Sequence, residues 1–391
     1  MGWLMIKNAA TEVQSGTATS RFFDSRASYL MFTIATTEKP VVAARIGEEL
    51  AHVRPGDHAL RVFDAGMGDA SVLTRLMRQM HRVFPHIPWL VVGKEISIED
   101  VRLALDRLPD RFAEHPELVF VVTNMYYPEA PSLSPAGRNE SELIWREAAL
   151  EGSTTDDFGR QIHGLFSDLV HDWEVMASPK TGNPLYVRPS VLVLYRKDRQ
   201  FLLNSVIPKP GGVDGKYDLI VASQPYRAGT TVEAKVRIAL VPLSRALAPG
   251  GRMVVVHSYG NDPGLEIIRG VWPDEDPFQV GRAELVAEAR RQLEAAADGD
   301  LVFPHQTDQE AIFRYDLQAM PSEVTEHIGT GLTLAAWNAA AYVAQIDEDR
   351  LSAALSSGAY VEATQSVLHR HGGLWFNDEA YVIARTGAEE G

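Results

Sequence analysis

Residues Leu60 to Met80 read LRVFDAGMGDASVLTRLMRQM, and this stretch decides the fold. It begins with an apolar run of the length of a buried strand and ends with apolar residues at helical spacing. The segment between them, Asp64 to Gly68, contains two glycines, which let the backbone pass close to a ligand. The helix that follows presents free N–H groups and a positive dipole end. The stretch therefore predicts a strand, a glycine turn and a helix around a ligand site.

Two families of α/β enzymes bind a cofactor at such a turn. Dinucleotide enzymes carry three glycines in the pattern G-x-G-x-x-G, with an acidic residue about 20 residues further on. Here Ser71 replaces the third glycine, and Asp64 stands shortly before the first. This D-x-G-x-G arrangement resembles the first motif of the class I S-adenosylmethionine (SAM) methyltransferases.

Composition restricts the classes of function. The chain has 391 residues, enough for two domains or for one domain with large insertions, and its formal net charge is −15. This charge argues against nucleic acid as a partner, because phosphate binding needs patches of Lys and Arg. The absence of cysteine excludes thiolate nucleophiles and Cys-bound zinc, and it suits a cytoplasmic location. No secretory leader and no apolar run of about 18 residues is found, so we expect no membrane association.

Polar residues follow the next two predicted strands, 89–93 and 119–123. Glu95 and its neighbour Ile96 follow the first of these, where the resemblance places an acid that accepts hydrogen bonds from both ribose hydroxyls. Asn124 follows the second, where relatives place a polar side chain against the adenine edge. By the same resemblance, the methionine part of SAM is received by the loop of Asp64, Ala65, Gly66, Met67 and Gly68.

The apolar run 217–222 predicts a strand that delivers Ser223-Gln224-Pro225-Tyr226. In relatives that methylate planar nitrogens, this position carries Asn, Asp or Ser, then two prolines and an aromatic residue. Gln224 replaces the first proline here, so two roles stay open for the tetrapeptide. Ser223 and Tyr226 either contact the acceptor, with Ser223 also near the cofactor, or only shape the floor of the pocket.

A fifth strand is predicted at 252–257 after the turn Ala248-Pro249-Gly250-Gly251, a pattern that is frequent in the family. His257 ends this strand and is a candidate general base, because the reference pKa of histidine is close to neutral pH. The predicted catalytic residues are thus His257, Tyr226 and Ser223. Substrate contacts are predicted from Tyr29, Gln224, Tyr226 and Tyr259.

The resemblance implies a Rossmann-like, doubly wound, mostly parallel seven-stranded sheet with an antiparallel C-terminal strand, plus large insertions. The last two strands are expected at 311–317 and 376–384. The chain is expected to begin with an N-terminal helical segment over the cofactor site (1–58), followed by the first part of the SAM-binding domain (59–127). An insertion that serves as a lid or oligomer contact (128–215) comes next. The second part of the domain (216–391) contains a helical insertion at about 319–372.

Periodicity also makes specific predictions inside the insertion. The segments 142–149 and 156–177 read as helices, and 191–195 with 201–206 reads as a β-hairpin. The apolar hairpin and the long helix would suit a homodimer contact.

Together these motifs predict a SAM-dependent methyltransferase that uses S-adenosyl-L-methionine, releases S-adenosylhomocysteine, and methylates an O or N nucleophile of a small biosynthetic metabolite. No metal is predicted, because His369-Arg370-His371 lacks carboxylates at metal-binding spacing. Two alternatives stay open: a non-catalytic SAM-binding regulatory protein and an NAD-dependent oxidoreductase.

Overall fold

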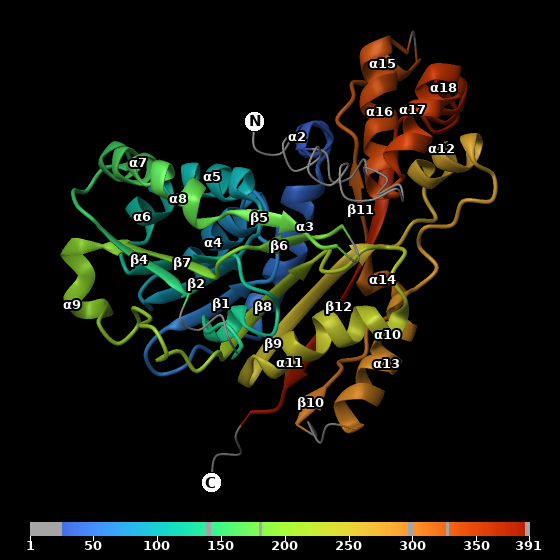
Figure 1. Ribbon diagram of the computed structural model, residues 1–391. Helices are drawn as coiled ribbons and strands as arrows, with labels where there is room; N and C mark the ends of the chain where they lie inside the picture. The colour runs from blue at the N-terminus through green and yellow to red at the C-terminus, as the bar shows by residue number, and fades with distance from the viewer. Residues whose placement is uncertain (1–25, 138–141, 180–181, 296–299, 326–327, 388–391) are drawn as a thin grey trace.

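The computed structural model describes residues 26–137, 142–179, 182–295, 300–325 and 328–387. A ten-stranded sheet runs through this part of the chain, with helices on both faces (Figure 1). From one edge to the other, its main strands are β4 (Ile144–Leu150), β7 (Ser190–Arg196), β3 (Leu118–Thr123), β2 (Trp89–Lys94), β1 (Leu60–Asp64), β8 (Tyr217–Ser223), β9 (Leu247–Ser258) and β12 (Trp375–Arg385). Two short strands, β10 (Leu301–Val302) and β11 (Ile312–Asp316), both pair with β12.

Seven of these strands form the predicted sheet. Strands β3, β2, β1, β8 and β9 are parallel to one another, whereas β12 is antiparallel to both β9 and β11. The prediction of a Rossmann-like sheet with an antiparallel C-terminal strand is therefore confirmed. Because parallel strands end at the same edge of a sheet, the turns after β1, β2, β8 and β9 lie together.

The other three strands were not predicted in the sheet. β10 extends it beside β12, and the segment 128–215 contributes β7, which is antiparallel to β3, and β4, which is parallel to β7. The prediction of a helix at 142–149 is wrong, because pairing with β7 overrides the helical propensity of that segment. The predicted hairpin is also wrong: both edges of β7 are already paired, and its proposed partner contains the short helix α9 (Gln200–Leu203).

Three helical segments of the chain are interrupted. The segment 156–177 divides at Leu165 into α7 (Thr155–Gly164) and α8 (Phe166–Asp172), and it ends in β5 (Val175–Ala177), which pairs with β6 (Pro184–Tyr186). Gly358, with φ of 74°, separates α17 (Glu348–Ser357) from α18 (Ala359–His371). Between α10 (Val232–Lys235) and α11 (Val241–Arg245) the helix widens into a π turn, Val236–Leu240, just before Pro242.

Apolar clusters hold the helices against the sheet. Alternate side chains of a strand face opposite ways, so Val62 of β1 joins the cluster on one face and Phe63 the cluster on the other. The first face carries α3 (Glu38–Gly47), α4 (Ser71–Val83), α5 (Ile98–Asp106), α6 (Pro109–Glu114), α7 and α8, and the second carries α11 and α13 (Arg282–Ala295).

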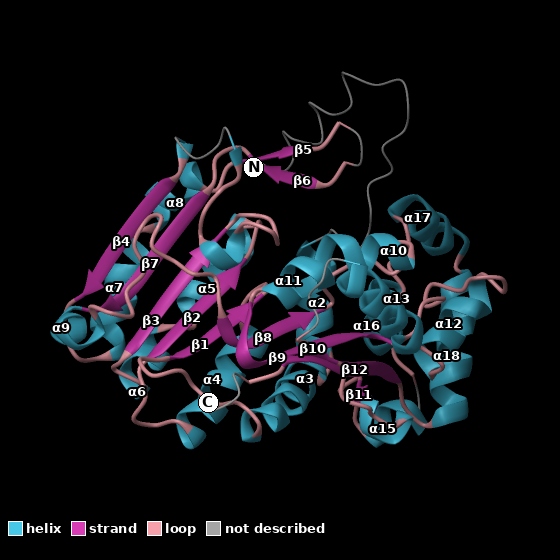
Figure 2. Ribbon diagram, turned by 90° about the horizontal axis from the view of Figure 1, so that it is seen from below, coloured by secondary structure: helices cyan, strands magenta, loops and turns pink. Residues whose placement is uncertain are grey.

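A third apolar cluster joins the helices beside the β11–β12 end of the sheet (Figures 1 and 2). Phe32 and Trp337 are among its buried members. The helices involved are α2 (Arg26–Ala35), α12 (Pro263–Val271), α15 (Pro321–Thr325), α16 (Thr330–Val343), α17 and α18, while α14 (Asp308–Ala311) precedes β11. No helix in the described ranges is long and apolar enough to cross a bilayer.

The close approach of β8 and β9 gives a first test of this fold. A Cβ atom at Gly251 would lie 2.6 Å from the carbonyl oxygen of Tyr217 and 2.8 Å from that of Ala248. Because both atoms belong to the backbone, we expect Gly251→Ala to lower the free energy of unfolding by about 1–3 kcal/mol, as overpacking does. Urea unfolding followed by circular dichroism measures the change.

The matched control is Gly56→Ala, because Gly56 is exposed and a Cβ there would meet no atom within 4 Å. Its stability should stay within about 0.5 kcal/mol of the wild type. Equal losses in the two variants would contradict the packing described for Gly251.

Candidate functional site

The predicted glycine turn lies between the end of β1 at Asp64 and the start of α4 at Ser71. Its backbone is tied to both neighbouring strands. The Ala65 N–H donates to the Val221 carbonyl of β8 at 2.9 Å, and the Met67 N–H donates to the Lys94 carbonyl of β2 at 3.1 Å. The sheet therefore fixes the turn from two sides.

The two glycines of the turn have different roles. Gly68 has φ of +52° and lies against the Tyr29 hydroxyl, so it provides the left-handed conformation that the turn requires. Gly66 is exposed, and a Cβ there would meet no atom within 4 Å. The backbone at Gly66 is therefore open to a ligand.

Asp64 places a buried carboxyl group beneath this turn. The residue is 2 % exposed, and its Oδ1 accepts the Gly66 N–H at 3.1 Å. Burial raises the pKa of Asp64 to about 7; the Gly66 N–H opposes this rise, and the negative charge of Glu95 adds to it. Asp64 therefore exchanges its proton close to neutral pH.

Glu95, which follows β2, connects the glycine turn to the start of α5. Its Oε2 accepts the Gly68 N–H at 3.1 Å, and its Oε1 accepts the N–H groups of Ile96 and Ser97 at 2.7 and 2.9 Å. An ionised carboxylate offers about four acceptor positions, so these three bonds leave one. A ribose contact by Glu95 and Ile96 stays a prediction.

Asp69 is a residue of this site that sequence reasoning missed. It accepts hydrogen bonds from the Ser71 hydroxyl at 2.6 Å, the Tyr29 hydroxyl at 3.1 Å and the Arg107 guanidinium at 2.8 Å. Burial raises the pKa of Asp69, but the bonds from Ser71 and the charge of Arg107 outweigh burial and lower it. The position of an acid directly before the first turn of α4 was the signal that could have found it.

Tyr29, predicted to contact the substrate, belongs to the cover of the turn. It lies on α2, and its ring is 6.0 Å from that of Tyr342 on α16. The Lys39 ammonium lies 5.3 Å from the centroid of the same ring. The helices α2 and α16 thus meet above Gly68 and Asp69, and a substrate contact by Tyr29 stays a prediction.

Asn124 connects two strands and is fully buried. Its Oδ1 accepts the Ser190 N–H at 2.8 Å, and its Nδ2 donates to the Arg188 carbonyl at 2.9 Å. Because these bonds occupy both ends of the amide, Asn124 joins β3 to the start of β7. An adenine contact by Asn124 stays a prediction.

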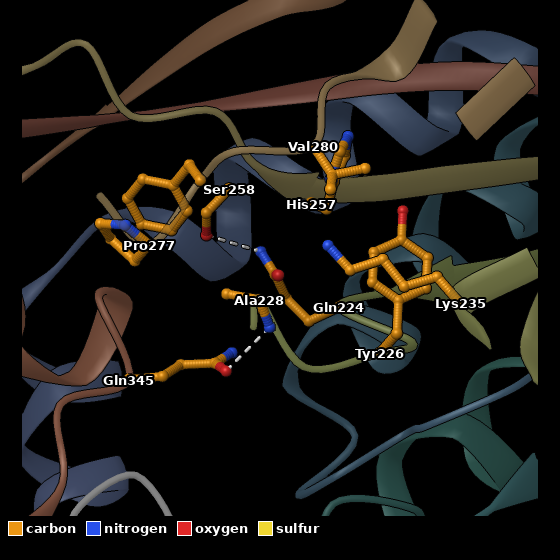
Figure 3. A pocket seen from close by; sticks show the side chains of 10 residues that line it. Gln224, Tyr226, Ala228, Lys235, His257, Ser258, Pro277, Val280 and Gln345 are labelled. Atoms are coloured by element: carbon orange, nitrogen blue, oxygen red, sulfur yellow. Dashed lines mark hydrogen bonds between the residues drawn. The ribbon is translucent and has the colours of Figure 1, made fainter. Parts of the chain in front are cut away.

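A second group of predicted residues gathers where β8 and β9 end, as Figure 3 shows. Ser223 ends β8 half-buried, and Gln224 follows with φ of 50° and donates to the Ser258 hydroxyl at 3.1 Å. The Tyr226 hydroxyl lies 3.2 Å from that of Tyr381. Burial raises the pKa of Tyr226 well above its usual range, so this phenol stays protonated.

His257 lies beside this tyrosine pair and faces an acid that sequence reasoning missed. Its Nε2 is 2.9 Å from Glu379 Oε1, and both residues are at least 96 % buried. Glu379 lies opposite His257 in the β9–β12 pairing, and its Oε1 also accepts the Arg282 N–H at 2.7 Å. The signal was the acidic pair Asp378-Glu379 directly before the apolar run 380–384.

Tyr259, the remaining predicted substrate contact, directly follows the end of β9 at Ser258. Its backbone N–H donates to the Asn377 carbonyl at 2.9 Å, which holds the end of β9 against β12. A substrate contact by Tyr259 stays a prediction.

Two hollows flank the ends of the central strands. One is lined by residues that include Gln224, Tyr226, Lys235, His257 and Gln345. The other is lined by residues of the glycine turn and basic side chains, among them Asp69, Ser71, Lys39, Arg75 and Arg107.

No family model matches the chain, and no curated protein matches it. Solved structures do resemble it. A geranyl diphosphate methyltransferase in complex with GPP and sinefungin is 14 % identical, with 88 % of this chain and 78 % of that chain covered and a TM-score of 0.31. A structure titled for the conversion of a disulfide bond into a thioacetal group during echinomycin biosynthesis is 11 % identical, with coverage of 88 % and 81 % and a TM-score of 0.33.

A further similar structure is the rRNA methyltransferase aviRa from Streptomyces viridochromogenes. It is 17 % identical, with 62 % of this chain and 76 % of that chain covered and a TM-score of 0.21. At TM-scores this low the likenesses do not bear on activity, so the function follows from the site itself.

The buried carboxyl group of Asp64 predicts how stability varies with pH. The pKa of Asp64 in the folded state is about 7, above its ordinary value of 3.8, so the folded state loses stability as pH rises from about 4 through 7. Asp64→Asn removes this loss. Relative to the wild type, the variant should gain about 2–3 kcal/mol in free energy of unfolding between pH 5 and pH 8.

Urea unfolding at several pH values from 5 to 8 measures this difference, with the exposed residue variant Asp57→Asn as the control. The gain should grow up to about pH 7 and then level off. A constant difference across this range would contradict the burial argument for Asp64.

Proposed function

We propose that this chain is a SAM-dependent methyltransferase that transfers a methyl group to an O or N nucleophile of a small metabolite. The observation that carries the proposal is the pair of carboxyl groups, Asp64 and Glu95, at the ends of adjacent parallel strands around a turn that is open at Gly66. This geometry matches the D-x-G-x-G motif with an acid after the second strand.

The charges at the turn favour a cationic ligand. Burial raises the pKa of Asp64 and that of Asp100 to about 7 each. The negative charge of Glu95 contributes to both increases. A sulfonium or ammonium group placed here would relieve the repulsion among these carboxylates. A dinucleotide would instead bring a pyrophosphate beside them, which weighs against the NAD-dependent alternative.

The residues present fit SAM in the following way. The loop from Asp64 to Gly68 would hold the methionine part, and Glu95 with Ile96 would hold the ribose. When bound, SAM supplies a methyl group on a sulfonium sulfur, and S-adenosylhomocysteine is a good leaving group because it departs as a neutral thioether. The open backbone at Gly66 provides the space for close approach.

The chain's own residues supply positioning and proton transfer on the acceptor side. His257 would take the proton from the acceptor, and Glu379, 2.9 Å from its Nε2, would orient the imidazole. Tyr226 and Ser223 would contact the acceptor from the end of β8. Because His257 is 4 % exposed and Tyr226 half-buried, this side of the site is poorly accessible to water.

Calorimetric titration with SAM, S-adenosylhomocysteine and NAD tests the proposal. We expect the two adenosyl compounds to bind and NAD not to bind. Gly66→Leu fills the open space and should weaken SAM binding roughly tenfold or more, without loss of thermal stability. Gly56→Leu is the matched control at another exposed glycine. Binding of NAD alone, or unchanged SAM affinity in Gly66→Leu, would refute the proposal.

Proton linkage gives a second test of the same site. A cation beside Asp64 favours its ionised form, so SAM binding should release about half a proton at pH 7, where the free carboxyl is half protonated. SAM affinity should accordingly rise from pH 6 to pH 8. Titration in two buffers of different ionisation enthalpy measures the release, which should fall by about half a proton in Asp64→Asn, while Asp100 can contribute the remainder. An unchanged release in this variant would assign the proton to another group.

A further inference from the structure

We propose that the hollow lined by Gln224, Tyr226, Lys235, His257 and Gln345 binds a small anionic ring compound, such as an aromatic carboxylate, through the ammonium group of Lys235. Its role as the methyl acceptor rests on the proposed function, whereas the binding of the anion does not.

Lys235 is the residue that points to an anion. It is 3 % exposed, and in the part of the chain that the structure describes its ammonium makes no hydrogen bond and no ion pair. The nitrogen lies 5.2 Å from the centroid of the Tyr226 ring, and Figure 3 shows the side chain reaching across that ring into the hollow. The Tyr226 ring is the contact of this ammonium, and no carboxylate of the described residues lies within ion-pair distance, so an anionic ligand in the hollow would supply the missing ion pair.

The surroundings of Lys235 support the same assignment. Burial lowers the pKa of Lys235, and the Glu284 carboxylate only partly offsets this. The Glu284 carboxylate also accepts the Gly281 N–H at 2.9 Å, so it is engaged on its own loop. The positive charge at the hollow is therefore only partly offset from within the protein.

Two residues with a strained backbone line the same hollow. Among the described residues, five non-glycine residues have positive φ, and two of them, Gln224 at 50° and Gln345 at 55°, line it. The π turn Val236–Leu240 begins directly after Lys235. Strained residues and π turns occur often at functional sites, where they hold side chains in the geometry needed for binding.

The walls of the hollow indicate the rest of the ligand. Tyr226, Pro277, Phe278 and Val280 present rings and aliphatic surface, so an apolar ring can pack there while its anionic group meets Lys235. His257 lines the same hollow and is available to a hydroxyl or amino group on that ring.

Saturation-transfer NMR and calorimetry with benzoate, phenyl phosphate and neutral benzamide test this inference on the full chain. Benzoate or phenyl phosphate should bind roughly tenfold or more tightly than benzamide, and the stronger of the two identifies the anionic group. Lys235→Met should abolish that preference, whereas Arg237→Met, an exposed cation on the same helical segment, should keep it. Phe278→Ala should weaken all three probes together.

Thermal unfolding of the same variants adds an independent readout. Because an unpaired buried ammonium destabilises the fold, Lys235→Met should melt at the wild-type temperature or above. A large drop in melting temperature, or equal binding of benzoate and benzamide to the wild type, would overturn the inference. Absence of SAM binding with an intact anion preference would instead overturn the proposed function alone.

Discussion

The parallel pairing of β1 with β2 on one side and β8 on the other is the constraint on which the site depends. It brings three strand ends to one edge of the sheet, and the glycine turn is then tied to both neighbours through Ala65 and Met67. The turn needs no regular secondary structure of its own. Its conformation is maintained because the backbone partners Val221 and Lys94 belong to strands whose registers are fixed by the apolar core.

Charged groups at this edge of the sheet are buried at a cost in stability, as expected where a ligand binds. Burial disfavours ionisation of Asp64, and the negative charge of Glu95 adds to this effect. Lys235 is a second example, an ammonium with 3 % exposure and no anionic contact. Groups of opposite charge thus lie at separate positions along one sheet edge, each without full compensation. Such uncompensated buried charge is expected where ligands of opposite charge bind, because ligand binding then relieves it.

The antiparallel strand β12 completes the second half of the site. It brings Glu379 beside His257 and Tyr381 beside Tyr226, although more than 120 residues separate each pair along the chain. Because β12 pairs with β9 residue by residue, the position of Glu379 follows from register and not from local sequence. Of the helices between β9 and β12, α12 and α15 to α18 join α2 in a separate apolar cluster and leave this pairing intact.

Local sequence determined the elements whose signal is local: the strand, turn and helix around Asp64, the buried parallel strands, and Glu95, Gln224 and His257 at strand ends. Tertiary structure decided everything that depends on a partner strand. Pairing with β7 made 144–150 a strand despite its helical pattern, and backbone bonds across β3 and β7 engaged the amide of Asn124. Nothing in the local sequence distinguishes Lys235 from other helical lysines, and it is the packing around it that leaves the residue only 3 % exposed. The physical reason is that hydrogen-bond pairing and desolvation arise from contacts between segments distant in the chain, which local periodicity does not encode.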